Sequence, residues 1–344
     1  MKVSVIIAIY KVSQYLRECL DSVCNQTYRD LEIICVVGNT DKPSMDITKE
    51  YAAKDSRIKL VPVVPTGVAA ARNTGLREVT GECIAFVDGD DYIDLDMIET
   101  MVTALEEENA DISIVSKYYY YENTVEGIFY EGRKTFDKKG VMEEILKNEN
   151  FFLHLWDKLY RRDVFTGVTF KEGAIVEDRQ VCFALLNKAE KFVFTPQSKY
   201  YFRQSLDSSS KVYKNVKDSV GEDFIICEQI LKMYPEFMYD VELFLVIEHM
   251  SLLQNSFLYG VYSKEHDRET IEYIKKHMIK AMKCPRASKS LKAKMLLSVY
   301  ATERFGKITV KRRNEFLKSH RHFKSGNDWE KLFKEQGIEI EPEL

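Results

Sequence analysis

The sequence lacks the marks of several common protein classes. Its seven cysteines form no Cys-x-x-Cys pair, so neither a disulfide framework nor a zinc site is expected. Such a scattered set is typical of reduced thiols in a cytosolic compartment. No window approaches the roughly 20 apolar residues of a membrane-spanning helix, and the N-terminal apolar run is too short for a signal peptide. We therefore expect a protein that is soluble or peripheral to a membrane.

Strong net charge and phosphate-binding loops are lacking too. The formal net charge is only −4, so no general attraction to nucleic acid is expected. No Gly-x-Gly-x-x-Gly follows the first apolar run, and no Gly-x-x-x-x-Gly-Lys-Ser/Thr occurs anywhere. These absences disfavour a nicotinamide-binding domain and a P-loop NTPase. The 45% hydrophobic and 30% charged residues are typical of a globular protein, and 344 residues allow two or more compact units, or one larger domain with an appendage.

The first hundred residues alternate between apolar runs and amphipathic segments. We expect strands over residues 3–10, 31–37, 58–64 and 83–87, with helices beginning at residue 13 and covering residues 44–53 and 68–78. Strands that alternate with helices on short connections predict a parallel sheet covered on both faces. Ligands of such sheets bind beyond the carboxyl ends of the strands.

Three carboxylates follow the fourth of these strands, in the run Asp88-Gly89-Asp90-Asp91. Acids this close repel one another unless a cation joins them, and oxygen ligands at a strand end suit Mg²⁺ or Mn²⁺. The alternative is an acidic turn without a ligand. The position of the run, at the edge where the other strands also end, favours a site.

Three blocks in this order resemble a known family: VSVIIAIYKVSQYLRECLDSVCNQTY, then GVAAARNTGL, then GECIAFVDGDDYID. They are similar to the family 2 glycosyltransferases of bacterial surface-polysaccharide synthesis. The resemblance is strong to about residue 115 and thinner to about residue 210. It implies an α/β fold of the GT-A type, Rossmann-like with a mostly parallel central sheet. The expected domains are 1–212, which binds the nucleotide-sugar and is catalytic, and 213–344, a mostly helical C-terminal extension.

The resemblance also implies the residues that hold the donor. Asp88-Gly89-Asp90 corresponds to the family's DxD motif, in which Asp88 faces the ribose and Asp90 holds Mn²⁺ or Mg²⁺ on the diphosphate, with Asp88 as the second metal carboxylate. Arg72 would reach the nucleotide, and Tyr10 would lie against the base. The implied donor-binding set is Ala8, Tyr10, Val37, Arg72, Asp88 and Gly89.

The sequence departs from the family where the base would be read. The family has Asp-Asp-Gly-Ser after its second strand, with a carboxylate that accepts a hydrogen bond from uracil. Here residues 37–40 are Val-Gly-Asn-Thr. Asp41 could accept the hydrogen bond from uracil only if the correspondence with the family motif shifted by several residues. A buried donor without its acceptor costs about 1–3 kcal/mol. Weaker or altered base recognition is expected, and a donor other than a UDP-sugar is a second hypothesis.

A second set of motifs resembles the acceptor side of the family. Trp156 begins the run WDKLYRR, which is similar to the family's W-x-K-L-Y-R element and implies acceptor binding. Glu177-Asp178 precedes an apolar helical run; acids there also complement the helix dipole, which is the alternative explanation. The family places its catalytic base at the position of Asp178, and Glu177 would orient the pair or bind acceptor. Attack opposite the diphosphate would invert the anomeric centre.

The C-terminal third is rich in helical periodicity and in basic residues. Apolar stripes after residue 213 predict a helical bundle, which would pack on the catalytic domain, bind acceptor or form a homodimer. The segment 275–294 carries eight lysines and arginines, and no acid occurs from Ile274 to Thr302. The alternatives are a solvated helix face and a basic patch that rests on anionic lipid.

The sequence therefore predicts a metal-dependent inverting glycosyltransferase that moves a sugar from a nucleotide-diphosphate donor, UDP-linked by preference, to a glycan or lipid-linked acceptor. We expect a cytoplasmic protein, peripheral on the inner face of the membrane, without a nucleic-acid partner. A second hypothesis is a catalytically weakened homologue that binds nucleotide or glycan as a partner subunit. A nucleotidyltransferase is disfavoured, because the glycine-rich basic loop of that class is missing at residues 8–11.

Overall fold

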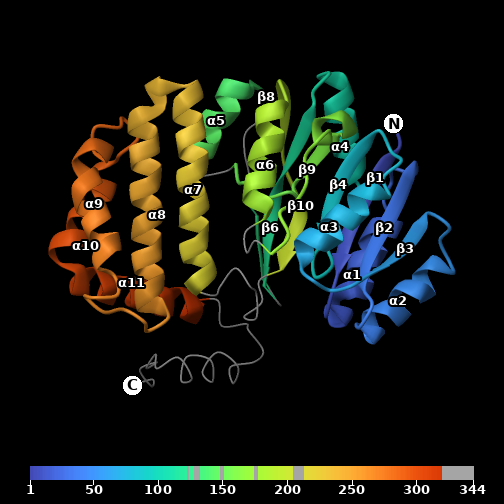
Figure 1. The fold of residues 1–344 in the computed structure, drawn as a ribbon, viewed down its shortest axis with the longest axis horizontal. Coiled ribbons are helices and arrows are strands. Elements are labelled where there is room, and N and C mark those ends of the chain that lie inside the picture. The colour runs from blue at the N-terminus through green and yellow to red at the C-terminus, as the bar shows by residue number, and fades with distance from the viewer. Residues whose placement is uncertain (122–123, 128–131, 148–150, 174–176, 204–212, 320–344) are drawn as a thin grey trace. The chain divides into compact units, whose positions relative to one another are not determined.

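The computed structural model describes residues 1–121, 124–127, 132–147, 151–173, 177–203 and 213–319 (Figure 1). These residues form two compact units. The sheet unit lies within residues 1–204 and contains the central sheet, and the helical unit consists mainly of residues after 204 and contains helices α7 to α11. The predicted domain boundary at residue 212 stays a prediction, because residues 204–212 lie outside the described part.

The sheet has the order β3-β2-β1-β4-β9-β6-β10-β5, with β7 beside β6 and β8 beside β10. Its strands are β1 (Val3–Ile9), β2 (Leu31–Gly38), β3 (Ile58–Val63), β4 (Cys83–Asp88), β5 (Tyr92–Ile93), β6 (Ile112–Tyr121), β7 (Thr124–Gly127), β8 (Lys134–Asp137), β9 (Lys158–Arg161) and β10 (Lys191–Arg203). Strands β1 to β4 pair in parallel, and β9 runs antiparallel between β4 and β6. The predicted α/β class, with a mostly parallel sheet, is confirmed.

Helices of the sheet unit follow the strands along the chain. They are α1 (Ser13–Cys24), α2 (Lys42–Ala52), α3 (Val68–Arg77), α4 (Met97–Glu107), α5 (Lys138–Lys147) and α6 (Glu177–Lys188), with the 3₁₀ helix η1 (Arg162–Phe165) after β9. The predicted alternation over the first hundred residues is therefore present. Strand β1 reads as a continuous apolar run because it lies between β2 and β4 and is buried along nearly its whole length.

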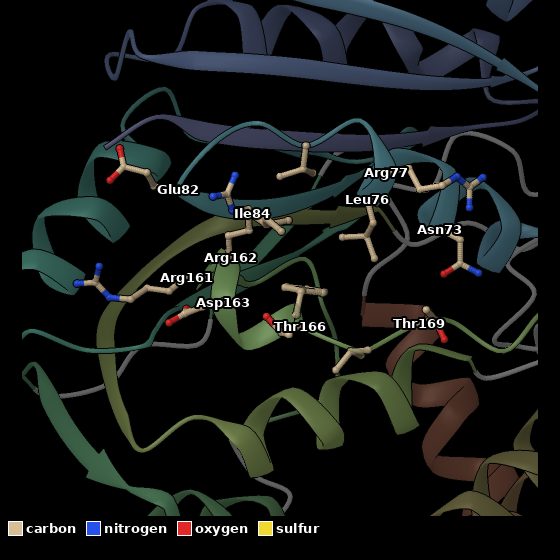
Figure 2. A pocket seen from close by; sticks show the side chains of 13 residues that line it. Asn73, Leu76, Arg77, Glu82, Ile84, Arg161, Arg162, Asp163, Thr166 and Thr169 are labelled. Atoms are coloured by element: carbon tan, nitrogen blue, oxygen red, sulfur yellow. The ribbon is translucent and has the colours of Figure 1, made fainter.

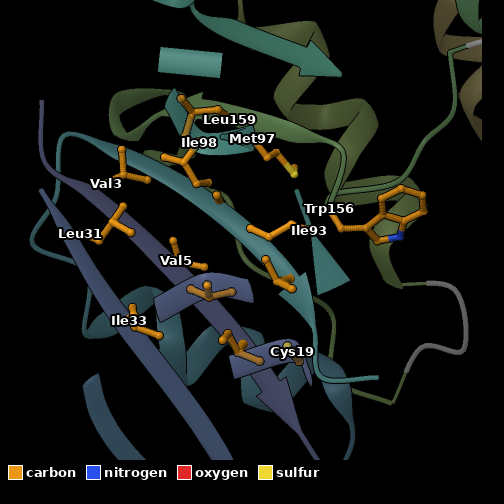
Figure 3. Close-up of a cluster of buried hydrophobic side chains, with 14 of the residues drawn as sticks. Val3, Val5, Cys19, Leu31, Ile33, Ile93, Met97, Ile98, Trp156 and Leu159 are labelled. Atoms are coloured by element: carbon orange, nitrogen blue, oxygen red, sulfur yellow. The ribbon is translucent and has the colours of Figure 1, made fainter. Parts of the chain in front are cut away.

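The main core packs one face of the sheet against α1 and α4 (Figure 3). Val5, Ile33 and Ile98 are fully buried there. On the other face of β4, the Phe86 ring packs against Phe165, with ring centroids 5.9 Å apart. Side chains alternate along a strand, so Phe86 and Asp88 share a face. This packing fixes β4 from both sides and thereby holds the end of the strand in place.

The register of the parallel strands brings their carboxyl ends together. Ala8 of β1 lies opposite Val36 of β2 on one side and opposite Asp88 of β4 on the other. The segments that follow these three strands consequently leave the sheet at one edge, as the sequence predicted. We call it the carboxyl edge.

The helical unit is a bundle with its own core. Its helices are α7 (Tyr213–Met233), α8 (Met238–Leu258), α9 (Arg268–Ala281), α10 (Lys289–Tyr300) and α11 (Thr302–Ser319), with the 3₁₀ helix η3 (Pro235–Phe237) before α8. Val246, Leu253 and Ile274 are among its fully buried residues. The predicted helical C-terminal region is thus confirmed. No helix in the described ranges is both long enough and apolar enough to span a bilayer.

Candidate active site

The turn after β1 presents an aromatic ring at the carboxyl edge. Tyr10 is 44% exposed, and its ring lies against Gly38 at the end of β2. A Cβ atom on Gly38 would stand only 2.6 Å from Cδ2 of Tyr10. The ring can therefore occupy this position only because residue 38 has no side chain. Sequence reasoning missed Gly38, although a glycine at the end of a buried strand is a recognisable signal.

Asp41, the acid nearest to the missing base-reading carboxylate, is engaged by the backbone. Its Oδ2 accepts a hydrogen bond from the Lys11 amide at 2.5 Å, and its Oδ1 accepts one from the Ser44 amide at 3.4 Å. The first bond holds the turn after β1, where Lys11 has a positive φ of 57°. The second caps α2. The Asp41 side chain is buried, and each of its oxygens is engaged by a backbone amide.

The acidic turn after β4 contains one structural acid. Asp91 is only 2% exposed; its Oδ2 accepts a hydrogen bond from the Tyr200 hydroxyl at 2.8 Å, and its Oδ1 accepts one from the Arg203 amide at 2.7 Å. The Tyr200 hydroxyl also accepts a hydrogen bond from the Asp88 amide at 3.1 Å. Strand β10 thus clamps the turn. Neither Tyr200 nor Arg203 was predicted, because nothing in sequence relates them to a turn more than 100 residues earlier.

The other two acids of the turn are less buried than Asp91. The Asp88 side chain is 29% exposed, and Asp90 is half-buried. Burial raises the pKa of Asp90, and the neighbouring Asp88 carboxylate raises it further, whereas Arg203 lowers it. Asp90 forms no ion pair with any described residue. Two carboxylates with unfavourable mutual repulsion suit a site for a cation.

Gly89, between these two acids, allows the chain to approach the end of β1 closely. A Cβ atom there would stand 3.1 Å from the carbonyl oxygen of Ala8 and 3.1 Å from Cγ2 of Val12. The turn therefore packs directly on the end of β1. Ala8 is half-buried beside it, whereas the Val37 side chain is fully buried in the core. Any contact that Val37 makes with a ligand would accordingly involve its backbone.

Arg72 connects the acidic turn to a distant pair of acids. It lies on α3 and is only 6% exposed. Its Nη2 lies 3.1 Å from Oδ1 of Asp88, and its Nη1 lies 2.6 Å from Oε1 of Glu177. Burial would lower the pKa of Arg72, but Asp88, Asp178 and Glu177 outweigh it and raise that pKa. One guanidinium group thus joins the acidic turn to Glu177, which lies 105 positions after Arg72 in the chain.

Glu177 and Asp178 form the first turn of α6. Burial raises the pKa of both carboxyl groups. Arg72 lowers both pKa values, and Asp88 raises them. Asp178 is half-buried and makes no ion pair with a described residue, whereas Glu177 is held by Arg72. A carboxylate with a raised pKa in such a position can accept a proton. Residues 174–176, just before this pair, lie outside the described residues.

Trp156 belongs to an aromatic stack behind the acidic turn. Its ring lies 4.2 Å from Tyr200 and 4.8 Å from His154, between centroids, and only 4% of the residue is exposed. The side chain therefore presents little surface to an acceptor, and the half-buried His154 and Phe152 extend the stack outward. Burial lowers the pKa of His154 well below its usual range, as for a packed, neutral histidine.

Lys158 of the same sequence element is fully buried beside the stack. Its Nζ donates to the carbonyl oxygens of Phe152 and His154 at 2.9 and 2.7 Å, and lies 2.5 Å from Oδ1 of Asp157. These bonds satisfy the buried ammonium group and fix the segment that carries His154 and Trp156. The W-x-K-L-Y-R element is thus part of the framework that supports the acidic turn.

A metal ion would find two protein carboxylates at this edge. Within the described ranges no group of three or more His, Cys, Asp or Glu side chains could hold a metal ion. Mg²⁺ and Mn²⁺ in nucleotide sites often take one or two carboxylates and complete their shell with phosphate oxygens and water. Asp88 and Asp90 fit that sparse arrangement, provided that a diphosphate supplies the remaining ligands.

A cavity of about 860 Å³ lies in the sheet unit away from this edge (Figure 2). Its wall includes Ile84, four residues before Asp88 on the same strand, and Arg162 after β9. Phe86 lies between Ile84 and Asp88 on β4, and its ring packs against Phe165 and Phe170. Asp88, Arg72 and Glu177 do not line the cavity, and the chemistry is assigned to their cluster.

Comparisons with known proteins show what this chain is similar to in sequence. The family model for glycosyl transferase family 2 matches residues 4–168. The chain is 33% identical over 223 residues to glycosyltransferase GlyA of Streptococcus pneumoniae; the match covers 62% of this chain and about a third (32%) of that relative.

Solved structures share the fold. The crystal structure of S. aureus TarS 1-349 in complex with UDP-GlcNAc matches with a TM-score of 0.67 at 18% identity, over 92% of each chain. Mannosyltransferase PcManGT from Pyrobaculum calidifontis, in complex with GDP-Man and Mn²⁺, matches with a TM-score of 0.53 at 14% identity, over 89% of this chain and 88% of that one. The GT-A fold predicted from the sequence is confirmed. Over residues 4–168, this chain therefore resembles the glycosyltransferases of family 2.

Proposed function

We propose that the protein is a metal-dependent inverting glycosyltransferase that uses a nucleotide-diphosphate sugar. The observation that supports this most directly is the Arg72 bridge, which ties Asp88 of the acidic turn to Glu177 next to Asp178. The reaction needs a cation site for the leaving diphosphate and a base for the attacking hydroxyl, close to each other. The bridge holds the proposed metal-binding Asp88 and the proposed base Asp178 in one cluster.

The donor half of the site would consist of Asp88, Asp90 and Tyr10. Bound Mn²⁺ or Mg²⁺ would neutralise the charge that develops on the diphosphate as the bond to the sugar breaks. Asp88 and Asp90 would hold the ion, and the exposed face of Tyr10 would stack on the base. The clamp of Asp91 by Tyr200 and Arg203 keeps the two metal carboxylates oriented before the donor binds.

The acceptor half would consist of Asp178, Glu177 and the outer end of the aromatic stack. Asp178 would take the proton from the acceptor hydroxyl as its oxygen attacks the anomeric carbon from the face opposite the diphosphate. A single displacement of this kind inverts the anomeric centre. Arg72 would keep Glu177 ionised and leave Asp178 as the carboxylate available for the proton.

The donor class that we propose is a UDP-sugar, with a different base as the alternative because Asp41 is engaged by the backbone. The acceptor would be a glycan or a lipid-linked glycan of a cell-surface polysaccharide. The reaction would take place on the cytoplasmic face of the membrane, with residues 1–212 as the catalytic domain and residues 213–344 as the helical extension. The helical extension would also allow two copies of the chain to form a homodimer.

One observation favours a second candidate function, that of a weakened homologue that binds nucleotide or glycan as a partner subunit. The family's base-reading acid is replaced at residues 37–40, and the nearest acid is fixed by Lys11 and Ser44. A homologue that has lost base recognition would keep the fold and the acidic turn while losing turnover.

Calorimetric titration with nucleotide diphosphates, with and without Mn²⁺, separates these functions when it is combined with an assay of donor-sugar hydrolysis. The enzyme predicts metal-dependent binding that Asp90→Asn abolishes and Asp178→Asn preserves, together with turnover that both changes remove. Asp46→Asn, an exposed carboxylate on α2, is the matched control. Metal-dependent binding without any turnover would favour the partner subunit, and binding that survives Asp90→Asn would disprove the metal assignment.

A further inference from the structure

The basic segment of the helical unit divides into two groups of charges. One group is engaged inside the bundle: Nζ of Lys280 lies 2.6 Å from Oε1 of Glu242, Nη2 of Arg286 lies 2.8 Å from Oδ1 of Asp240, and Nζ of Lys294 donates to the Gln254 side chain at 3.5 Å. These cations bind helices to one another.

The second group has no such partner. This group consists of the exposed Lys275, Lys276, Lys283 and Lys289 and the half-buried Lys292. No described residue forms an ion pair with any of these five side chains. They lie on α9, on the connection after it and on α10, two helices that pack against each other. No acid occurs between Ile274 and Thr302, and Glu272, one turn before Lys275 and Lys276 on α9, is the nearest acid in the sequence before them.

Large apolar side chains lie between these lysines at helical spacing. Ile279 on α9 is 60% exposed, and it stands three to four residues from Lys275, Lys276 and Lys283. On α10, Leu296 is 44% exposed and Tyr300 is 67% exposed. Residues three and four apart share one side of a helix, so Lys289, Lys292, Leu296 and Tyr300 follow one another along the same side.

We infer that this surface, formed by the outer sides of α9 and α10, binds the anionic surface of a membrane. Lysines near such a surface are attracted to acidic headgroups, while apolar and aromatic side chains enter the boundary between headgroups and acyl chains. A second copy of the chain would bring like charges together. A nucleic acid or another soluble polyanion would use the lysines alone and would leave Ile279, Leu296 and Tyr300 in water.

The experiment uses the full chain without donor or acceptor, so its outcome does not depend on the proposed enzyme activity. Sedimentation is measured with vesicles of zwitterionic lipid and with the same vesicles containing phosphatidylglycerol, at low and at raised salt. The expected result is binding only to the anionic vesicles, weakened by salt.

Two variants test the two components of the surface. Lys276→Gln, Lys283→Gln and Lys289→Gln together should lower the partition coefficient at least tenfold, since each lysine near the membrane contributes about fivefold. Leu296→Ser with Tyr300→Ser should also weaken binding, without changing its dependence on salt. The control is Lys49→Gln, Lys217→Gln and Lys232→Gln, which removes the same charge from exposed lysines elsewhere and should leave binding nearly unchanged. All of these side chains are exposed, and circular dichroism checks that each variant is folded.

Three results would overturn the inference. The first is a triple variant that binds like the wild type, and the second is a control that loses as much affinity as the triple variant. The third is unchanged binding of the Leu296–Tyr300 double variant combined with full competition by soluble polyphosphate, because that pair of results identifies a polyanion site.

Discussion

The acidic turn of the sheet unit and the basic segment of the helical unit are both runs of like charge, yet the fold treats them differently. In the acidic turn, Asp91 is buried and bonded to β10, while Asp88 is bridged to another acid by Arg72. In the basic segment, three cations are engaged by the bundle and five are left without an ion pair to a described residue. A run of like charge acquires a role only through the groups that the fold places beside each member.

The depth of burial explains the difference. Charges at the carboxyl edge are partly withdrawn from water, where an uncompensated charge is costly and each carboxylate needs a cation or a donor. Charges on the outer side of α9 and α10 remain hydrated and cost little. The first arrangement creates a site with shifted pKa values, and the second creates a surface whose attraction depends on salt.

The largest expected effect concerns the proposed base. Asp178→Asn should lower kcat by about 10²–10⁴-fold while leaving nucleotide binding and the folded state intact. In the wild type, burial raises the pKa of Asp178, so kcat/KM should fall as the pH decreases through that raised pKa. A pH–rate profile of wild type and variant checks this. Full activity in Asp178→Asn would remove the residue from the mechanism.

The next effect tests the bridge between the two halves of the site. Arg72→Met should lower the free energy of unfolding by about 3–5 kcal/mol, because it leaves Glu177 buried without its cation. Arg17→Met, which breaks an exposed pair with Glu50, is the control and should destabilise the protein much less, because water screens that pair. Urea denaturation of both variants measures the difference. Equal losses would mean that burial does not distinguish the two ion pairs.

A smaller effect concerns the clamp on the acidic turn. Tyr200→Phe removes the hydroxyl that donates to Asp91 and accepts from the Asp88 amide, and it should cost about 1–3 kcal/mol in unfolding free energy. Affinity for nucleotide diphosphate with Mn²⁺ should also fall, because the two proposed metal carboxylates lose their orientation. Tyr51→Phe removes a less buried hydroxyl that donates to Asp21 and should cost less. A Tyr200→Phe variant with unchanged metal-dependent binding would show that the clamp only stabilises the fold.

The smallest effect distinguishes the two groups of lysines. Lys280→Gln, which breaks the pair with Glu242, should lower the free energy of unfolding by up to about 1 kcal/mol. Lys276→Gln should leave it unchanged within about 0.5 kcal/mol, because that side chain is exposed and has no partner among the described residues. Thermal or urea denaturation compares the two. A larger loss for Lys276→Gln would contradict the division of the basic segment.

The sequence by itself determined the strands and helices of the first hundred residues, the carboxyl edge and the resemblance to family 2 glycosyltransferases. Alternating apolar runs specify a parallel sheet, and Asp88-Gly89-Asp90 is a local pattern that can be read without a structure. Arg72 and the Glu177–Asp178 pair were identified by resemblance, but their direct connection through one guanidinium group was not.

Only the tertiary structure decided the role of each charge. Asp41 is a scaffold acid because the turn after β1 and the start of α2 both direct amides at it, and Asp91 is structural because β10 returns Tyr200 and Arg203 to the turn. Trp156 is buried because β10 also brings the Tyr200 ring against it. Burial and hydrogen-bond partners come from segments far apart in the chain, and composition and spacing do not encode which of these segments will meet.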